Sequence, residues 1–290
     1  MNERLADFYI IGAMKCATST LHEQLACREA FFMTEPKEPN FFNDDALYPV
    51  QFGWYKGLFR DARVEQICGE SSTHYTKFPT YQGTAQRIHE HTPEARLVYV
   101  MRDPVERLVS HYIHEWTEGR ARGDISQAVL SDDQFVAYSS YARQLKEYMR
   151  FFDKSHILPV FFECLTNDRA GELERVARFL GDPGKEPFLW HKEVQQTNVS
   201  KDRMRKSAIR DALLSLEWGR RVKDALPTNL KDKIKSFWQM RDRPTLNEEA
   251  LEHVRQVLGS DLRELSSMLG VEFTLDSFKE KAKVTRATFI

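Results

Sequence analysis

The sequence has few cysteines, and none of the four lies close to another along the chain. They are Cys16, Cys27, Cys68 and Cys164. A zinc site needs ligands at short spacings, and a disulfide framework needs a denser set of cysteines, so we expect neither. We therefore predict reduced thiols and no metal site.

The sequence also lacks an excess of either charge, and it lacks a long apolar run. Lysine and arginine number 42 against 43 aspartate and glutamate residues, which gives a net charge of −1. This balance provides no global attraction to nucleic acid or to a membrane surface. No apolar run approaches the length that crosses a bilayer, and the first expected strand starts too early to leave room for a signal peptide. We expect a cytoplasmic protein with no nucleic-acid partner and no stable membrane insertion.

No internal repeat, low-complexity block or linker divides the chain. At 290 residues, either one large α/β domain or two small domains could bury a core. We predict a single domain over residues 1–290, in which residues 279–290 form a loosely held basic tail. The sequence does not indicate an oligomeric state.

Residues 8–21 organise the rest of the chain. They read FYIIGAMKCATSTL: an apolar run ends at Gly12, a short loop carries Lys15, and three hydroxyl residues lead into a helical pattern. A strand, a loop and a helix in this order bring a helix N-terminus to the carboxyl edge of a sheet. Unpaired N–H groups and the positive end of the helix dipole favour an anion there. The hydroxyls of Thr18, Ser19 and Thr20 can cap the helix, and Lys15 adds a full charge, so we predict a phosphate-binding loop.

This loop is not the common nucleotide-binding pattern, in which Ser or Thr directly follows Gly-Lys. Here Lys15 lies three residues after Gly12, and Cys16 follows it. An ordinary strand-to-helix turn with a solvated lysine is the alternative, and short motifs produce false positives of this kind.

Two more segments place polar residues at expected strand ends. Residues 35–42 read EPKEPNFF, and their two prolines restrain a loop that carries Glu38. Residues 66–69 form a short expected strand, and residues 70–75 then read ESSTHY. The alternative for the first segment is a surface loop with a solvated Glu38. The alternative for the second is a turn whose hydroxyl groups form hydrogen bonds with its own backbone.

Residues 96–101 form the clearest expected strand, nearly all apolar as a buried parallel strand should be. Arg102 follows it, and Asp103, Pro104 and Glu106 fit the start of a helix. Ser110 lies further along that helix. A surface ion pair is the alternative for Arg102, but the end of a strand is where open α/β sheets bind ligands.

The second half of the chain gives further helix and strand signals. Residues 131–152 have the spacing of one long helix, and the strand at 157–162 carries Pro159, which indicates a strand start or an edge. Thr245 and Glu248 have the spacing of a capping box before a long amphipathic helix. The densest basic stretch lies between these elements; it contains Ser200, Lys201, Arg203 and Arg205.

Alternating strands and helices predict an α/β fold with three layers, in which helices flank a mostly parallel sheet in a P-loop-like arrangement. Its carboxyl edge would gather Lys15 and the hydroxyls, Glu38, His74 and Arg102. Such an edge offers cations for phosphates beside a carboxylate that can act as a base. The spacing alone does not identify the reaction.

The residues resemble a known family. Residues 11–21 resemble the 5′-phosphosulfate-binding loop of sulfotransferases that use 3′-phosphoadenosine 5′-phosphosulfate (PAPS), and residues 102–112 resemble their 3′-phosphate-binding segment. Residues 37–42 are similar to the base-bearing loop of the heparan sulfate sulfotransferase-like branch, here in the form of a bacterial-type stand-alone enzyme. The resemblance covers roughly residues 8–180.

The resemblance implies a role for each matched residue. Lys15 would contact the 5′-phosphate and stabilise the leaving group, together with Cys16, Ala17, Thr18, Ser19 and Thr20 of the same loop. Arg102 and Ser110 would bind the 3′-phosphate, and Glu38 would take the proton of an acceptor hydroxyl or amine. The implied acceptor is a small molecule, a lipid or a carbohydrate, and we expect its pocket near Trp54 and after Trp116.

Two departures from the family pattern leave alternatives open. The branch usually has a lysine where this chain has Ser71. Either Lys15 alone then acts on the leaving group, or His74 shares the acid–base work. The alternative for His74 is an ordinary core or surface histidine. A late glycine-containing basic loop is not evident, and Ser200, Lys201, Arg203 and Arg205 are its expected substitute. The competing hypotheses are a P-loop kinase that uses ATP and a non-catalytic nucleotide-binding module.

Overall fold

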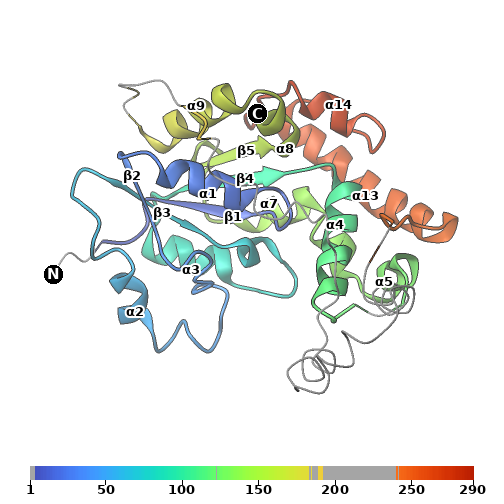
Figure 1. Ribbon diagram of the computed structural model, residues 1–290, viewed down its shortest axis with the longest axis horizontal. Helices are drawn as coiled ribbons and strands as arrows, with labels where there is room; N and C mark the ends of the chain where they lie inside the picture. The colour runs from blue at the N-terminus through green and yellow to red at the C-terminus, as the bar shows by residue number, and fades with distance from the viewer. Residues whose placement is uncertain (1–3, 122, 183, 185–188, 192–239, 241) are drawn as a thin grey trace, which may run out of the picture.

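A parallel sheet of five strands forms the centre of the molecule (Figure 1). The computed structural model describes residues 4–121, 123–182, 184, 189–191, 240 and 242–290. The strands are β1 (Phe8–Gly12), β2 (Phe31–Met33), β3 (Ile67–Ser71), β4 (Arg96–Met101) and β5 (Ile157–Phe161). Their order is β2-β3-β1-β4-β5, and every neighbouring pair is parallel.

The helices pack around this sheet (Figure 1). The longer ones are α1 (Thr18–Ala26), α3 (Thr84–His91), α4 (Pro104–Thr117), α5 (Ile125–Ser131), α7 (Tyr141–Met149), α9 (Arg169–Leu180) and α13 (Glu248–Leu269). The shorter helical elements are α2 (Phe52–Gly57), η1 (Thr73–Thr76), α6 (Gln134–Ala137), η2 (Lys154–His156), α8 (Phe162–Asn167) and α14 (Phe278–Ala282). The predicted α/β fold with a mostly parallel sheet is confirmed.

The apolar runs of the sequence become the centre of the sheet. Strand β1 is buried along its whole length, and β4 is buried from Leu97 to Met101. Strand β5 lies at the end of the strand order, so Pro159 occupies an edge strand as its missing N–H requires. Because β1 and β4 are parallel neighbours, the loops that follow them leave the sheet at the same edge.

The prediction of one long helix over residues 131–152 is wrong. This stretch contains the end of α5, the short α6 and α7. Helix α7 starts at Tyr141 because the Asp261 carboxylate, on the distant helix α13, accepts hydrogen bonds from the N–H groups of Ala142 and Arg143 at 3.0 and 2.9 Å. A cap supplied 119 residues away leaves no local signal in the sequence.

Two expectations for the C-terminal region also need correction. The side chain that caps α13 is Asn247, which accepts from the Ala250 N–H at 2.9 Å, and not Thr245. The tail is not loosely held: α14 begins at Phe278, and Ala282 and Ala287 are buried against the main core. In residues 279–290 small apolar residues are interspersed among lysines, so the sequence does not indicate this packing. In the part of the chain that the structure describes, no helix is long and apolar enough to span a membrane.

Gly69 provides a test of the packing between β1 and β3. A Cβ atom at this position would lie 2.1 Å from the Phe8 ring, which is completely buried on the neighbouring strand. We expect Gly69→Ala to lower the free energy of unfolding by about 1–3 kcal/mol through overpacking, measured by urea denaturation.

Gly53→Ala is the matched control, because no atom lies within 4 Å of a Cβ at Gly53 in helix α2. This variant should be as stable as the wild type or slightly more stable, since alanine favours a helix. Equal stability of the two variants would contradict the packing described for β1 and β3.

Candidate active site

The loop after β1 has the backbone of an anion-binding site. Lys15 and Ala17 both adopt left-handed backbone conformations, with φ of 71° and 64°. Ala17 is the N-cap of α1, and no side chain caps this helix. The hydroxyl residues at 18–20 therefore form the first helical turn and do not cap it, contrary to expectation. The N–H groups of this turn stay open toward a ligand.

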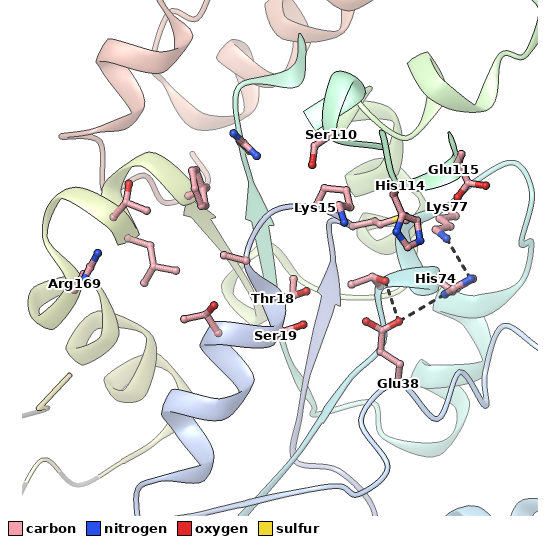
Figure 2. Close-up of a pocket in the computed structure, with 18 of the residues that line it drawn as sticks. Lys15, Thr18, Ser19, Glu38, His74, Lys77, Ser110, His114, Glu115 and Arg169 are labelled. Atoms are coloured by element: carbon pink, nitrogen blue, oxygen red, sulfur yellow. Dashed lines mark hydrogen bonds and ion pairs between the residues drawn. The ribbon is translucent and has the colours of Figure 1, made fainter. Parts of the chain in front are cut away.

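Most of the predicted site residues line one cavity of about 420 Å³ at the carboxyl edge of the sheet (Figure 2). They are Lys15, Ala17, Thr18, Ser19, Thr20, Glu38, His74, Arg102 and Ser110. Cys16 is not among them: its thiol is buried beneath the loop, and burial raises the pKa of Cys16 to about 12. Ser200, Lys201, Arg203 and Arg205 lie outside the described residues.

Arg102 enters the cavity from the end of β4. Its guanidinium lies over the Phe162 ring at 4.7 Å, and its Nη2 atom lies 3.2 Å from the Glu106 carboxylate. The predicted start of α4 is confirmed, because Pro104 occupies the first turn and the Asp103 side chain accepts from the Glu106 N–H at 2.8 Å. Ser110 lies two turns further along α4 and also lines the cavity. Arg102 and Ser110 therefore form a second polar group beside the Lys15 loop.

Lys15 is a desolvated cation. Burial lowers the pKa of Lys15, and the nearby Arg102 lowers it further. Among the described residues, no carboxylate forms an ion pair with its ammonium group. A cation that has lost part of its hydration without gaining a counter-charge favours an anionic ligand.

Glu38 is fixed in the cavity wall by its own backbone and by the end of β3. Its φ is 59°, and its N–H donates to the Ser71 carbonyl oxygen at 3.0 Å. The carboxylate accepts hydrogen bonds from Lys37 Nζ at 2.7 Å and from Thr73 Oγ1 at 3.2 Å. Burial raises the pKa of Glu38, but Lys37 and Thr73 outweigh burial, and the net pKa is lowered. Glu38 is therefore ionised at neutral pH and able to accept a proton.

The histidine of the predicted site is neutral. His74 lies in the short helix η1, and its Nδ1 atom is 3.9 Å from Glu38 Oε2. Burial and the neighbouring Lys77 lower the pKa of His74 to about 4. Lys77 also lines the cavity, and burial lowers its pKa to about 8. Lys77 was not among the predicted site residues, although it lies three residues after His74 in the sequence.

Ser71 and Glu70 lie behind the cavity. Ser71 is buried, and its Oγ atom lies 2.9 Å from His22 Nδ1, so the position where the family usually has a lysine points into the protein. Glu70 is also buried and accepts hydrogen bonds from the Tyr55 hydroxyl at 2.5 Å and from Ser72 Oγ at 2.6 Å. Ser72 Oγ in turn accepts from the Asn40 N–H at 3.1 Å. These bonds connect the core to the loop that carries Glu38.

The two ends of the cavity differ in character. Phe162, Leu165 and Trp190 give one end an apolar lining, and Arg169 lies over the Trp190 ring at 5.1 Å. At the other end, beyond Glu38, the side chains of His74, Lys77, His114 and Glu115 gather (Figure 2). Arg120, after Trp116, lines this end as expected, whereas Trp54 is 42% exposed and is not part of the lining.

The fold and the cavity define a class of protein: a parallel α/β protein with an anion-binding loop after its first strand and a second cationic group on the neighbouring strand. Comparison with known proteins identifies the family. The family model described as "Sulfotransferase domain" matches residues 5–265, so the chain belongs to the sulfotransferase domain family. The predicted resemblance to sulfotransferases is therefore confirmed.

The most similar curated relatives include heparan sulfate glucosamine 3-O-sulfotransferase 6 of Mus musculus, which is 34% identical over 188 residues, covering 61% of this chain and 53% of the relative. The Homo sapiens bifunctional heparan sulfate N-deacetylase/N-sulfotransferase 2 is 24% identical over 213 residues, covering 64% of this chain and 23% of the relative. The chain thus spans about half the length of the first of these relatives.

A solved sulfotransferase from Alicyclobacillus acidocaldarius has the same fold. Its TM-score is 0.66 at 20% identity, and the match covers 93% of this chain and 98% of that one. The agreement over nearly the full length of both chains supports the described order of strands and helices.

Glu70 gives a prediction for the pH dependence of stability. Burial raises the pKa of Glu70 to about 7, above its ordinary value of 4.5. As pH rises, the unfolded chain therefore releases this proton at a lower pH than the folded protein does. The contribution of protonated Glu70 to the free energy of unfolding is complete below pH 4.5 and is lost as pH rises through about 7. We expect the wild type to lose stability between pH 5 and pH 8 by an increment that Glu70→Gln does not lose, measured by urea unfolding across this range.

The exposed Glu65 provides the control for this measurement, and Glu65→Gln should follow the wild-type pH dependence. An identical pH dependence in Glu70→Gln and the wild type would show that Glu70 does not titrate in this range.

Proposed function

We propose that this protein is a PAPS-dependent sulfotransferase. The observation that carries the proposal is that Lys15 and Arg102, from the ends of the neighbouring strands β1 and β4, line the same cavity. Two separate cationic groups suit a nucleotide with phosphates at both its 5′ and 3′ positions. The open N–H groups at the start of α1 add donors for the 5′-phosphosulfate. ATP has no 3′-phosphate to bring to Arg102.

The donor lies along the cavity with its phosphates at these two groups. The 5′-phosphosulfate binds to Lys15 and the residues at 17–20, and the 3′-phosphate binds to Arg102 and Ser110. The apolar end formed by Phe162 and Trp190 suits the adenine base. The sulfuryl group then faces Glu38 and the polar end of the cavity, where the acceptor binds.

Transfer is an in-line displacement at sulfur. Glu38 takes the proton of the acceptor hydroxyl or amine, a bond forms between the acceptor atom and sulfur, and the bond from sulfur to the bridging oxygen breaks. The electron pair of that bond goes to the 5′-phosphate, and the Lys15 ammonium stabilises the new charge. The products are the sulfated acceptor and 3′,5′-ADP. Such a reaction depends on alignment and on neutralising the leaving group.

The acceptor is a carbohydrate. This proposal is supported by the heparan sulfate sulfotransferases among the relatives, whose names specify a glucosamine unit. The polar lining beyond Glu38 is consistent with a ligand that carries many hydroxyl groups. Small molecules and lipids are the other acceptor classes, and a panel of the three classes distinguishes them.

A kinase that uses ATP is the less favoured alternative. In that class a serine or threonine directly after the lysine binds the magnesium ion. Cys16 occupies this position, and its buried thiol does not line the cavity. A non-catalytic nucleotide-binding module is the other alternative, but an ionised Glu38 beside the phosphate loop favours catalysis.

Donor recognition predicts a preference for 3′,5′-ADP. At about 100 times its dissociation constant a ligand stabilises the protein by about 2.7 kcal/mol, which a thermal shift detects. We expect Arg102→Gln to weaken 3′,5′-ADP binding by roughly 10- to 150-fold, the equivalent of a lost charged hydrogen bond of about 1.5–3 kcal/mol, and to leave 5′-AMP binding unchanged.

Arg150→Gln is the control for this experiment, because Arg150 is a surface residue that pairs with Glu147. It should bind 3′,5′-ADP as the wild type does. Stabilisation by ATP with magnesium but not by 3′,5′-ADP would reject the proposed donor.

Glu38→Gln tests the base. The variant keeps the shape of the side chain but cannot accept the acceptor's proton, so we expect turnover to fall by about 10²–10⁴-fold while 3′,5′-ADP binding is retained. Sulfate transfer from labelled PAPS to the acceptor panel measures the effect, with Glu65→Gln as the surface control. Unchanged turnover removes Glu38 as the base. If the wild type transfers sulfate to no acceptor, the non-catalytic module is favoured.

A further inference from the structure

Lys77 is a buried cation in the cavity to which the proposed reaction assigns no role. Only 8% of its surface is exposed, and it lies at the polar end of the cavity (Figure 2). No carboxylate of the described residues lies within ion-pair distance of its ammonium group. Its hydrogen-bond partner is His74, whose Nε2 atom is 3.1 Å from Lys77 Nζ.

The contact between these two side chains determines where His74 carries its proton. A lysine ammonium has three N–H donors and no acceptor, so the nitrogen that faces it must accept. Nε2 of His74 is therefore unprotonated. Because His74 is neutral at pH 7, with its pKa lowered to about 4 by burial and then by Lys77, its one ring proton is on Nδ1.

This protonated nitrogen lies on the side of the ring that faces Glu38. Nδ1 is buried, has no hydrogen-bond partner among the described residues and lies 3.9 Å from Glu38 Oε2. Figure 2 shows the three side chains in a row, from Lys77 through His74 to Glu38. A buried donor without an acceptor is costly, and Glu38 is the acceptor within reach. In complexes, such long contacts of an active site shorten when the ligand closes the site.

We propose that Lys77 is a positioning residue. It holds His74 in the tautomer with its proton on Nδ1, so that this N–H donates a hydrogen bond to the Glu38 carboxylate during sulfate transfer. The inference rests on the proposed function, because it takes Glu38 as the base. It also assigns His74 the role of a donor to the base: with Nε2 occupied by Lys77 and Nδ1 protonated, His74 has no free nitrogen to accept the acceptor's proton.

The donors around Glu38 then orient the carboxylate. Lys37 Nζ donates to Oε1, Thr73 Oγ1 donates to Oε2, and His74 Nδ1 faces Oε2, so donors face both oxygens of a carboxylate that lines the cavity. The other charged groups that act on His74 are Glu115 and Arg120, and these two pair with each other at 2.6 Å. Their charges largely cancel, which leaves two charges beside the ring: Lys77, which lowers the pKa of His74, and the Glu38 carboxylate, which raises it.

The tautomer can be measured directly. Histidine labelled with ¹⁵N is incorporated into the full chain, the 3′,5′-ADP complex is formed, and the His74 signals are assigned with His74→Gln. We expect the Nδ1–H tautomer at pH 7 in the wild type. In Lys77→Met the tautomers should redistribute and the pKa of His74 should rise, because a positive charge has been removed. A wild-type Nε2–H tautomer overturns the proposal, as does an unchanged His74 spectrum in Lys77→Met.

Kinetics with the acceptor found in the panel complete the test. We expect Lys77→Met to lower kcat by at least about tenfold with the KM for PAPS unchanged, because proton transfer to a positioned base contributes this much or more. Lys77→Arg, which also only donates, should recover part of the loss. Lys146→Met, at a half-exposed lysine paired with Glu264, is the control and should match the wild type. Full activity of Lys77→Met overturns the proposal.

The two readouts separate this inference from the proposed function. The tautomer of His74 is observed whether or not an acceptor is turned over, whereas the proposed function fails only if PAPS or 3′,5′-ADP does not bind or no acceptor is sulfated. Thermal melts of the Lys77 variants confirm that they are folded before either readout is interpreted.

Discussion

The parallel pairing of β1 with β4 is the constraint on which the site depends. Phe8 pairs with Arg96 and Ile10 with Val98, so both strands run in the same direction through the buried centre of the sheet. Each strand end is followed by a loop and a helix start, at α1 and at α4. The sheet thus sets the spacing of the two strand ends from which Lys15 and Arg102 extend. A rigid spacing of this kind suits a rigid ligand with two separated anionic groups.

Strand β3, on the other side of β1, positions the remaining residues of the cavity wall. Its end holds the Glu38 loop through the Ser71 carbonyl oxygen and the Thr73 hydroxyl, and the turn after it carries His74 and Lys77. Three adjacent strands therefore each contribute one part of the proposed site: the Lys15 loop, Arg102, and the support of Glu38, the proposed base. Burial strengthens the electrostatic interactions of these charges, because a desolvated ion interacts with its neighbours more strongly than a hydrated one.

Local patterns in the sequence predicted the elements whose causes are local. The strand at 96–101 follows from its apolar run, and the Asp103 cap follows from residues directly beside it. Local patterns gave wrong predictions where residues distant in the sequence determine the structure. Asp261 starts α7 from another helix, and the C-terminal residues pack on a core that their own composition does not indicate. The cavity shows the same contrast: the motif around Lys15 indicated residues that line it, whereas Lys77 reaches it through the turn of η1, which no local pattern indicated.

The hydroxyl of Ser72 connects the loop that carries Glu38 to the aromatic core, since it donates to Glu70 and accepts from the Asn40 N–H. Glu70 in turn holds the hydroxyl of Tyr55, which stacks on Phe41 with the ring centroids 4.5 Å apart. A change of ring size or loss of the phenol at position 55 therefore acts along this chain of hydrogen bonds on the position of Glu38, the proposed base, as well as on the packing of the core.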